Sequence, residues 1–185
     1  MQADVLKHLR KFWPKRSFTE RTWPYGGITW SLPDFKVQCV APAEPNDGWV
    51  YVSSGACSVP TNDGVRLEFV ITSPFDDDVH VETLSMVAHS HADARYRKHV
   101  GKVIAIGRPW MDLSTCNHLL VSLPYPFGPE FEVCRVGDVT VRLLWLTPIT
   151  PAEARYAAQC GYEALEDLLE QHAVDTLDPH RASVV

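Results

Sequence analysis

The chain has 185 residues, 45% of them apolar, and a formal net charge of −6, so it is long enough to bury a substantial core. There is no basic excess and no apolar run of membrane-spanning length, so neither nucleic acid nor a membrane is an expected partner. One domain over residues 1–185 is expected, with two very small domains as the alternative. The opening "MQADVLKHLRKFWPKR" lacks the apolar core of a secretory signal, so we expect a cytoplasmic protein.

The first half of the chain reads as a helix followed by strands. Residues 4–13 have apolar side chains at helical spacing, and Pro14 ends that helix. The loop "TWPYGGITWSLP" follows. Strands are then predicted at residues 35–41, 49–54 and 65–72, with turn signals at 44–48 and 61–64.

The middle of the chain predicts a helix over residues 73–96 and then further strands. The helix has an acidic start at 76–78, where the helix dipole favours negative charge. A loop is expected at 108–117. The predicted strands of this part are residues 102–107, 118–123, 131–136 and 138–146.

A final helix has a clear start signal. Thr150 as N-cap, Pro151 at the first helical position and Glu153 three residues after the cap form a capping box. Gly161 falls in mid-helix, where it costs about 1 kcal/mol against alanine, so a close approach to another element or a bend is expected there. The whole pattern predicts an α+β fold with a mixed, largely antiparallel sheet covered on one side by helices.

The residues that could carry chemistry form no convincing catalytic or metal site. The five cysteines are odd in number, widely spaced and without a CxxC pair, which argues against both a disulfide framework and a four-cysteine zinc site. His89 and His91 are two residues apart on a helix and therefore point in different directions. The alternative hypothesis is a hydrolase- or transferase-type enzyme that uses Cys57 or Ser122 with a histidine such as His118.

Aromatic rings beside proline or glycine stand out more than any reactive group. They occur in "TWPYGG" (22–27), "GRPWMD" (107–112) and "LPYPFGP" (123–129), and such stiff loops suit protein or peptide recognition. The bland alternative is that these rings cover the protein's own core. In the third loop we expect one ring inward and one outward. The candidate partner-binding residues are Arg108, Pro109, Trp110, Asp112, Tyr125 and Phe127.

Several stretches, taken together in order and spacing, resemble the suppressor of fused domain family in its compact single-domain bacterial form. They are "LPDFKV", "WVYVSSGACS", "LEFVIT", "HVETLSMVAHSH", "VGKVIAIGRPW", "CNHLLVSLPYPFGP", "LLWLTPITPAEARYAAQCGYEALEDLLEQ" and "LDPHRASVV". The resemblance is clearest over residues 32–185. It implies an α+β sandwich-like domain without catalytic residues, metal or cofactor.

The resemblance also implies a kind of partner. Animal relatives sequester a zinc-finger transcription factor by strand pairing between two domains, whereas only one such domain is present here. Bacterial relatives include immunity proteins encoded beside toxins. We therefore expect a non-enzymatic module that binds a protein or peptide, with a toxin as the candidate partner, either by strand addition at a sheet edge or through the aromatic loops. A purely structural subunit of an oligomer is a third interpretation.

Overall fold

A computed structural model describes residues 1–44, 47–61 and 64–185 of the protein. The chain divides into two compact units, each built from two stretches of sequence. The first unit is Met1–Arg97 with Leu123–Trp145, and the second is Lys98–Ser122 with Leu146–Val185. The turns predicted at 44–48 and 61–64 lie partly outside the described residues.

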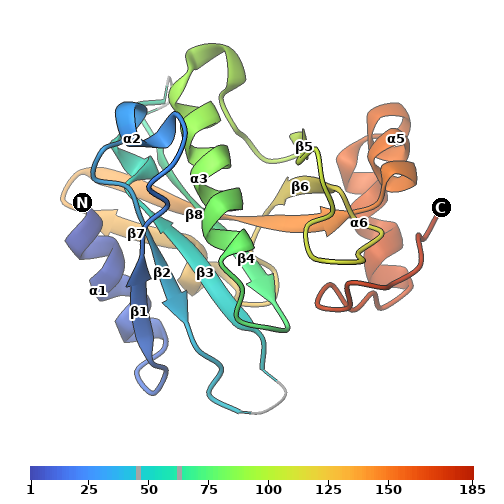
Figure 1. The fold of residues 1–185 in the computed structure, drawn as a ribbon, viewed down its shortest axis with the longest axis horizontal. Helices are drawn as coiled ribbons and strands as arrows, with labels where there is room; N and C mark the ends of the chain where they lie inside the picture. The colour runs from blue at the N-terminus through green and yellow to red at the C-terminus, as the bar shows by residue number, and fades with distance from the viewer. Residues whose placement is uncertain (45–46, 62–63) are drawn as a thin grey trace. The chain divides into compact units, whose positions relative to one another are not determined.

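The first unit contains most of the strands (Figure 1). Its helices are α1 (Gln2–Phe12), α2 (Ile28–Ser31), α3 (Val79–Ala92) and α4 (Pro129–Glu132), with 3-10 turns η1 (Ala56–Ser58) and η2 (Ala94–Tyr96). Its strands are β1 (Phe18–Arg21), β2 (Lys36–Val40), β3 (Trp49–Ser54), β4 (Arg66–Ser73), β7 (Val133–Val136) and the first part of β8 (Val139–Ile149).

The strands of the described residues form an eight-stranded sheet in the order β1-β2-β3-β4-β8-β6-β5, with β7 also paired to β8. Strands β1 to β4 are antiparallel neighbours, as in the register Trp49↔Ser73 between β3 and β4. Strand β4 runs parallel to β8, with Arg66 opposite Val141. The predicted α+β class with a mixed, largely antiparallel sheet is thus confirmed.

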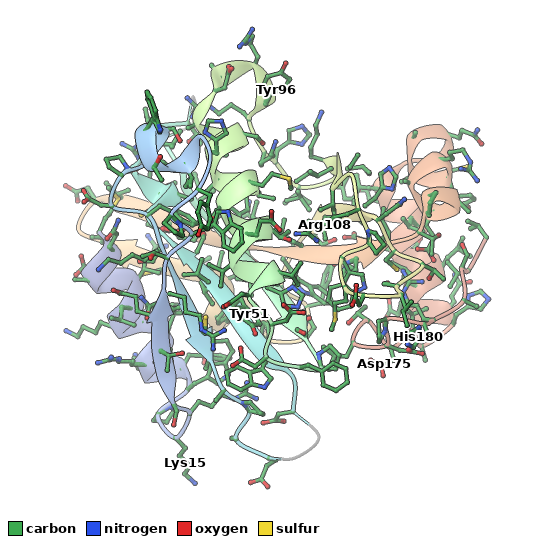
Figure 2. All side chains as sticks on the ribbon, viewed as in Figure 1. Lys15, Tyr51, Tyr96, Arg108, Asp175 and His180 are labelled. Atoms are coloured by element: carbon green, nitrogen blue, oxygen red, sulfur yellow. The ribbon has the colours of Figure 1, made fainter. Side chains whose placement is uncertain are left out.

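Both faces of the first unit's sheet are covered, not one as the sequence predicts. Val50 and Val52 of β3 share a core cluster with Leu9 of α1. Tyr51 lies between them in sequence and so points to the opposite face. There the centroid of its ring lies 4.9 Å from that of the His80 ring in α3. Tyr51 is labelled in Figure 2. Helices on both sides explain why successive residues of β3 are buried rather than alternately exposed.

Several predicted boundaries shift in this unit. The helix predicted over 73–96 begins only at Val79, because the acidic run forms its approach: Val79 N–H donates to the Asp77 carboxylate at 2.9 Å. The strand predicted at 131–136 begins at Val133, because the preceding residues form α4. Strand β1 and helix α2 are not predicted at all.

The second unit contains β5 (Val103–Ala105), β6 (His118–Ser122), α5 (Pro151–Cys160) and α6 (Tyr162–Gln171). The predicted capping box is confirmed: Glu153 N–H donates to the Thr150 hydroxyl at 3.2 Å, and Thr150 N–H donates to the Glu153 carboxylate at 2.8 Å. The single predicted helix is wrong. Gly161 has φ +94 and separates α5 from α6. Of the two expectations for this glycine, the bend is therefore the one that the structure shows.

Candidate partner-binding surface

A loop of the second unit, residues 107–116, is closed at its base and presents a leucine at its tip. Ile106 N–H donates to the carbonyl of Asn117 at 3.1 Å, and Trp110 N–H donates to the carbonyl of Cys116 at 2.9 Å. These bonds fix both ends of the segment, which we call the Leu113 loop. Backbone hydrogen bonds therefore close the base of this loop.

Leu113 is the unusual residue of this loop. Its side chain is 83% exposed, and its backbone lies in the left-handed region at φ +61. That conformation costs a non-glycine residue about 1–2 kcal/mol. Burial of the side chain does not offset this cost, because the side chain faces solvent. The left-handed backbone of Leu113 thus presents an apolar side chain to solvent.

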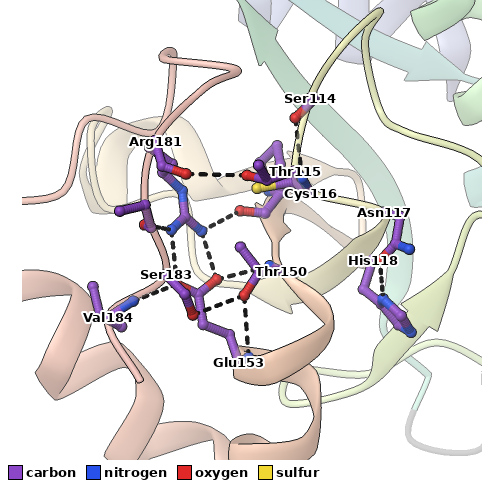
Figure 3. Close-up of polar contacts among 12 residues, drawn as sticks. Ser114, Thr115, Cys116, Asn117, His118, Thr150, Glu153, Arg181, Ser183 and Val184 are labelled. Carbon is purple, nitrogen blue, oxygen red and sulfur yellow. Dashed lines mark hydrogen bonds and ion pairs between the residues drawn. The ribbon is translucent and has the colours of Figure 1, made fainter.

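The C-terminal segment supports the Leu113 loop (Figure 3). Thr115 donates through its hydroxyl to the carbonyl of Arg181 at 3.0 Å and through its N–H to the carbonyl of Pro179 at 3.3 Å. Arg181 in turn binds both carboxylate oxygens of Glu153 at 2.7 Å. The loop is thereby linked to α5 through an ion pair that is almost completely buried.

The charge of Glu153 is preserved despite its burial. Burial acts to raise the pKa of Glu153, but the hydrogen bonds from Arg181 and from the Thr150 N–H outweigh it, so its pKa lies below 4.5. The pair therefore remains ionised at neutral pH and holds residues 181–184 against the start of α5.

The structure gives the four predicted residues of this loop different positions. Trp110 is 1% exposed, so its ring is not available for the direct contact that the sequence predicts. It can affect a partner only by supporting the loop. Arg108 is half-buried and donates to the carbonyl of Pro109 at 3.0 Å (Figure 2). Pro109 and Asp112 are exposed. A role for these residues in binding remains a prediction.

The two predicted rings of residues 123–129 belong to the first unit and point in different directions. The ring centroid of Phe127 lies 4.7 Å from that of Phe131 and 5.2 Å from that of Trp13, so Phe127 packs against the core beside α1. Tyr125 is 59% exposed. The expectation of one ring inward and one outward is confirmed, because Phe127 is partly buried against the core and Tyr125 is the more exposed ring.

Leu113 is not among the residues predicted from the sequence, and neither is any single residue of the first aromatic loop. Tyr25 is 67% exposed and Trp30 is 88% exposed. The position of Tyr25 beside Gly26 was a usable signal, because rings next to glycine often lie on turns, whereas Trp30 lies in the short helix α2. Nothing comparable distinguishes Leu113, because a single leucine in a loop has no periodicity to mark it.

The structure argues against the predicted Cys/Ser–His alternative. Cys57 is 1% exposed, and burial together with the neighbouring Glu68 raises the pKa of its thiol far above the usual value, which disfavours a nucleophilic thiolate. Ser122 donates its hydroxyl to Glu166. His118 contacts the side chain of Asn117 at 2.6 Å. Each of these groups is thus engaged in a contact that orders the fold.

The described residues contain neither a cluster of metal-ligating side chains nor a membrane-spanning helix. Within residues 1–44, 47–61 and 64–185, no group of three or more His, Cys, Asp and Glu side chains is arranged to hold a metal ion. The helices of these same segments are too short or too polar to cross a bilayer.

Sheet, helices and loops together define an α+β domain with a mixed, largely antiparallel sheet. Comparison of the sequence with known families agrees: the model described as "Suppressor of fused protein (SUFU)" matches residues 32–182. The chain belongs to the suppressor of fused family, as the sequence resemblance predicts.

Individual relatives extend this result. The crystal structure of a suppressor of fused homologue from Neisseria gonorrhoeae FA 1090 is 40% identical, with a TM-score of 0.88 over 100% of this chain and 96% of that one. The Sufu–Fu complex structure has a TM-score of 0.75 over 99% of this chain and 91% of the other, and at 13% identity it shows the shared fold alone.

The chain is also similar to the immunity protein YqcF of Bacillus subtilis (strain 168). The two are 25% identical over 122 residues, which is 65% of this chain. The match spans 64% of the length of YqcF, somewhat less than two thirds.

Proposed function

We propose that this chain is a non-enzymatic module that binds a protein or peptide, and that its partner is a toxin which it neutralises. The observation that carries the binding role is Leu113, exposed and strained at the tip of a loop that hydrogen bonds hold in place. The similarity to YqcF, an immunity protein by name, supports the toxin as the class of partner. Membership of the suppressor of fused family supports binding rather than catalysis.

The proposed contact surface is centred on Leu113. Arg108, Pro109 and Asp112 lie within five residues of it on the same loop, and Arg108 and Asp112 supply a polar rim. Full burial of a leucine side chain at an interface stabilises a complex by about 1.5–3 kcal/mol. Because the loop is already ordered, little of this is lost to ordering on binding. Tyr125 is proposed as a second contact through its exposed ring.

The family resemblance supports the remaining parts of the proposal. We propose a bacterial, cytoplasmic protein that acts as a single domain. Burial of Cys57 supports the non-enzymatic assignment, since the thiol that the enzyme hypothesis favours most is withdrawn from solvent.

Affinity capture from the native host, followed by purification of the captured protein, tests this function. Expression of the captured protein alone should arrest growth, and co-expression with this chain should restore it. A captured partner that is harmless when expressed alone would refute the toxin assignment while leaving the binding role standing.

The contact surface is tested with a glycine variant that removes the side chain but suits the backbone. Leu113→Gly should weaken binding of the purified partner by about 10- to 100-fold in calorimetry. Ala173→Gly is a matched control, because Ala173 is also exposed and left-handed, with φ +47, but lies outside the loop. Equal affinity of Leu113→Gly and wild type would exclude Leu113 as the contact.

A further inference from the structure

A small pocket in the first unit lies between the aromatic loop and helix α3. Its volume is about 220 Å³, and its lining includes Trp23 and Tyr25 from the loop and Glu82, Met86 and His89 from α3. The three α3 residues are spaced i, i+4 and i+7, so they lie along one side of the helix. The pocket therefore has one wall from a helix face and another from two rings.

The two rings are arranged as a corner. Their centroids are 5.5 Å apart, and their planes meet at 76°. Tyr25 is 67% exposed, so its ring can be reached from solvent. The faces of tryptophan and tyrosine attract cations within about 6 Å, and such corners of aromatic rings are the usual receptors of ammonium groups in proteins.

The charge around this pocket is negative. Glu82 lines the pocket itself. Asp76, Asp77 and Asp78 precede the same helix, and Arg21 binds Asp76 at 2.6 Å and Asp78 at 3.0 Å. One guanidinium thus accompanies four carboxylates at this end of α3. The chain as a whole has a net charge of −6. A cation entering the pocket would approach through a favourable potential.

The pocket is built rather than incidental. Ile28 anchors the loop, since it is 4% exposed. Ser31 contacts Nδ1 of His89 at 2.9 Å. A Cβ atom at Gly27 would lie 2.4 Å from the His89 ring, so a side chain at this position would require that ring to move. Loop and helix are therefore in direct contact through Ser31 and His89.

From this geometry we infer that the pocket binds one arginine or lysine side chain of a protein or peptide. Its volume is below the roughly 300 Å³ at which sites for small-molecule ligands begin, which suits a single side chain. The aromatic corner contacts the cationic head, and Glu82 supplies the counter-charge. This site is separate from the Leu113 loop and does not depend on the toxin assignment.

Nuclear magnetic resonance of the ¹⁵N-labelled full chain tests the inference with defined peptides. The probe is acetyl-Gly-Gly-Arg-Gly-Gly-amide, and its neutral isostere carries citrulline in place of arginine; the corresponding lysine and acetyl-lysine peptides form a second pair. The charged peptides should shift the Trp23 indole N–H and the α3 amides at concentrations up to about 20 mM, a range that detects single-side-chain affinities. The neutral peptides should bind at least about fivefold more weakly.

Two variants locate the site, each with a matched control. Tyr25→Leu and Glu82→Gln should each weaken binding by about two- to fivefold. Tyr96→Leu and Glu130→Gln change an exposed tyrosine and an exposed glutamate elsewhere and should leave it unchanged. Equal binding of arginine and citrulline peptides, or equal binding by the pocket variants and wild type, would overturn the inference.

Discussion

Removal of the Arg181 guanidinium should destabilise the protein far more than loss of an ordinary surface ion pair. Arg181 is 7% exposed and Glu153 is 0% exposed. The guanidinium binds both Glu153 oxygens at 2.7 Å and also donates to the carbonyl of Pro148 at 2.9 Å. In Arg181→Met the aliphatic length is kept, but the carboxylate and this carbonyl lose the guanidinium, and the carboxylate retains the N–H groups of Thr150 and Val184 as donors.

The expected loss follows from burial. Removing one member of a buried pair leaves an uncompensated charge and costs about 3–5 kcal/mol. This is a large part of the roughly 5–15 kcal/mol that stabilises a typical domain. With a urea dependence of about 2 kcal/mol per molar, the unfolding midpoint should fall by about 2 M. Circular dichroism and tryptophan fluorescence during urea titration measure it.

The pH dependence supplies an internal check. Because the folded-state pKa of Glu153 is lowered, its contribution is present above its unfolded value of 4.5 and is lost as pH falls through the folded value. The difference between wild type and Arg181→Met should therefore narrow in acid. In the double variant Glu153→Leu/Arg181→Met much of the stability should return, since no buried charge remains.

A loss below about 1 kcal/mol for Arg181→Met would refute the reasoning, because that is the value of solvated pairs. It would mean that water or a rearranged segment compensates Glu153, and that the support described for the Leu113 loop is not rigid.

Three further predictions follow from single residues. Burial raises the pKa of Glu68 despite hydrogen bonds from Ser53 and Gly55. The favourable contribution of Glu68 to folding stability is therefore present below pH 4.5 and is lost as the pH rises through the folded-state pKa. Glu68→Gln should flatten the pH dependence of the urea midpoint above pH 4.5, and an unchanged pH dependence would contradict this. Leu113→Gly should leave stability unchanged or raise it by up to about 1 kcal/mol, because the relief of backbone strain offsets the entropy of glycine; a clear loss in thermal unfolding would show that the leucine side chain is packed. Iodoacetamide should modify one thiol of the native protein, the exposed Cys160, and modification of any second thiol before unfolding would contradict the described burial. The thiols expected to react only after unfolding are Cys39, Cys57, Cys116 and Cys134.

Regular elements with strong local signals were predictable. The run 49–54 is apolar and β-branched, and it forms β3 with the same bounds. The capping box at Thr150 is a purely local pattern and is present as predicted. Gly161 shows the limit of periodicity, because the apolar stripe continues past it although the backbone does not remain helical.

Short edge elements were not predictable. Strand β1 has four residues, three of them polar, and pairs only with β2, so its sequence carries little hydrophobic pattern. The second covered face of the sheet was missed for a related reason. Alternation along 35–41 suggested one polar face, yet Gln38 is 3% exposed. Its buried amide is satisfied because it donates to the Glu20 carboxylate at 2.9 Å.

The candidate surface was predictable as a set of loops but not as a set of contacts. Stiffness could be inferred from proline and glycine, whereas the direction of each ring depends on packing that the sequence does not display. Trp110 and Tyr125 illustrate this, since both are rings beside proline, and one is buried while the other is exposed. The strain at Leu113 depends on the backbone, which no side-chain pattern encodes.

The interleaved path of the chain constrains any attempt to dissect this protein genetically. Neither unit is encoded by one continuous stretch, because the first is interrupted at Lys98–Ser122 and resumes at Leu123–Trp145. A fragment that ends at residue 97 would leave β4 without its parallel neighbour β8 and expose its apolar edge to aggregation. Internal deletion or circular rearrangement of the gene, rather than simple shortening, is the route to either half.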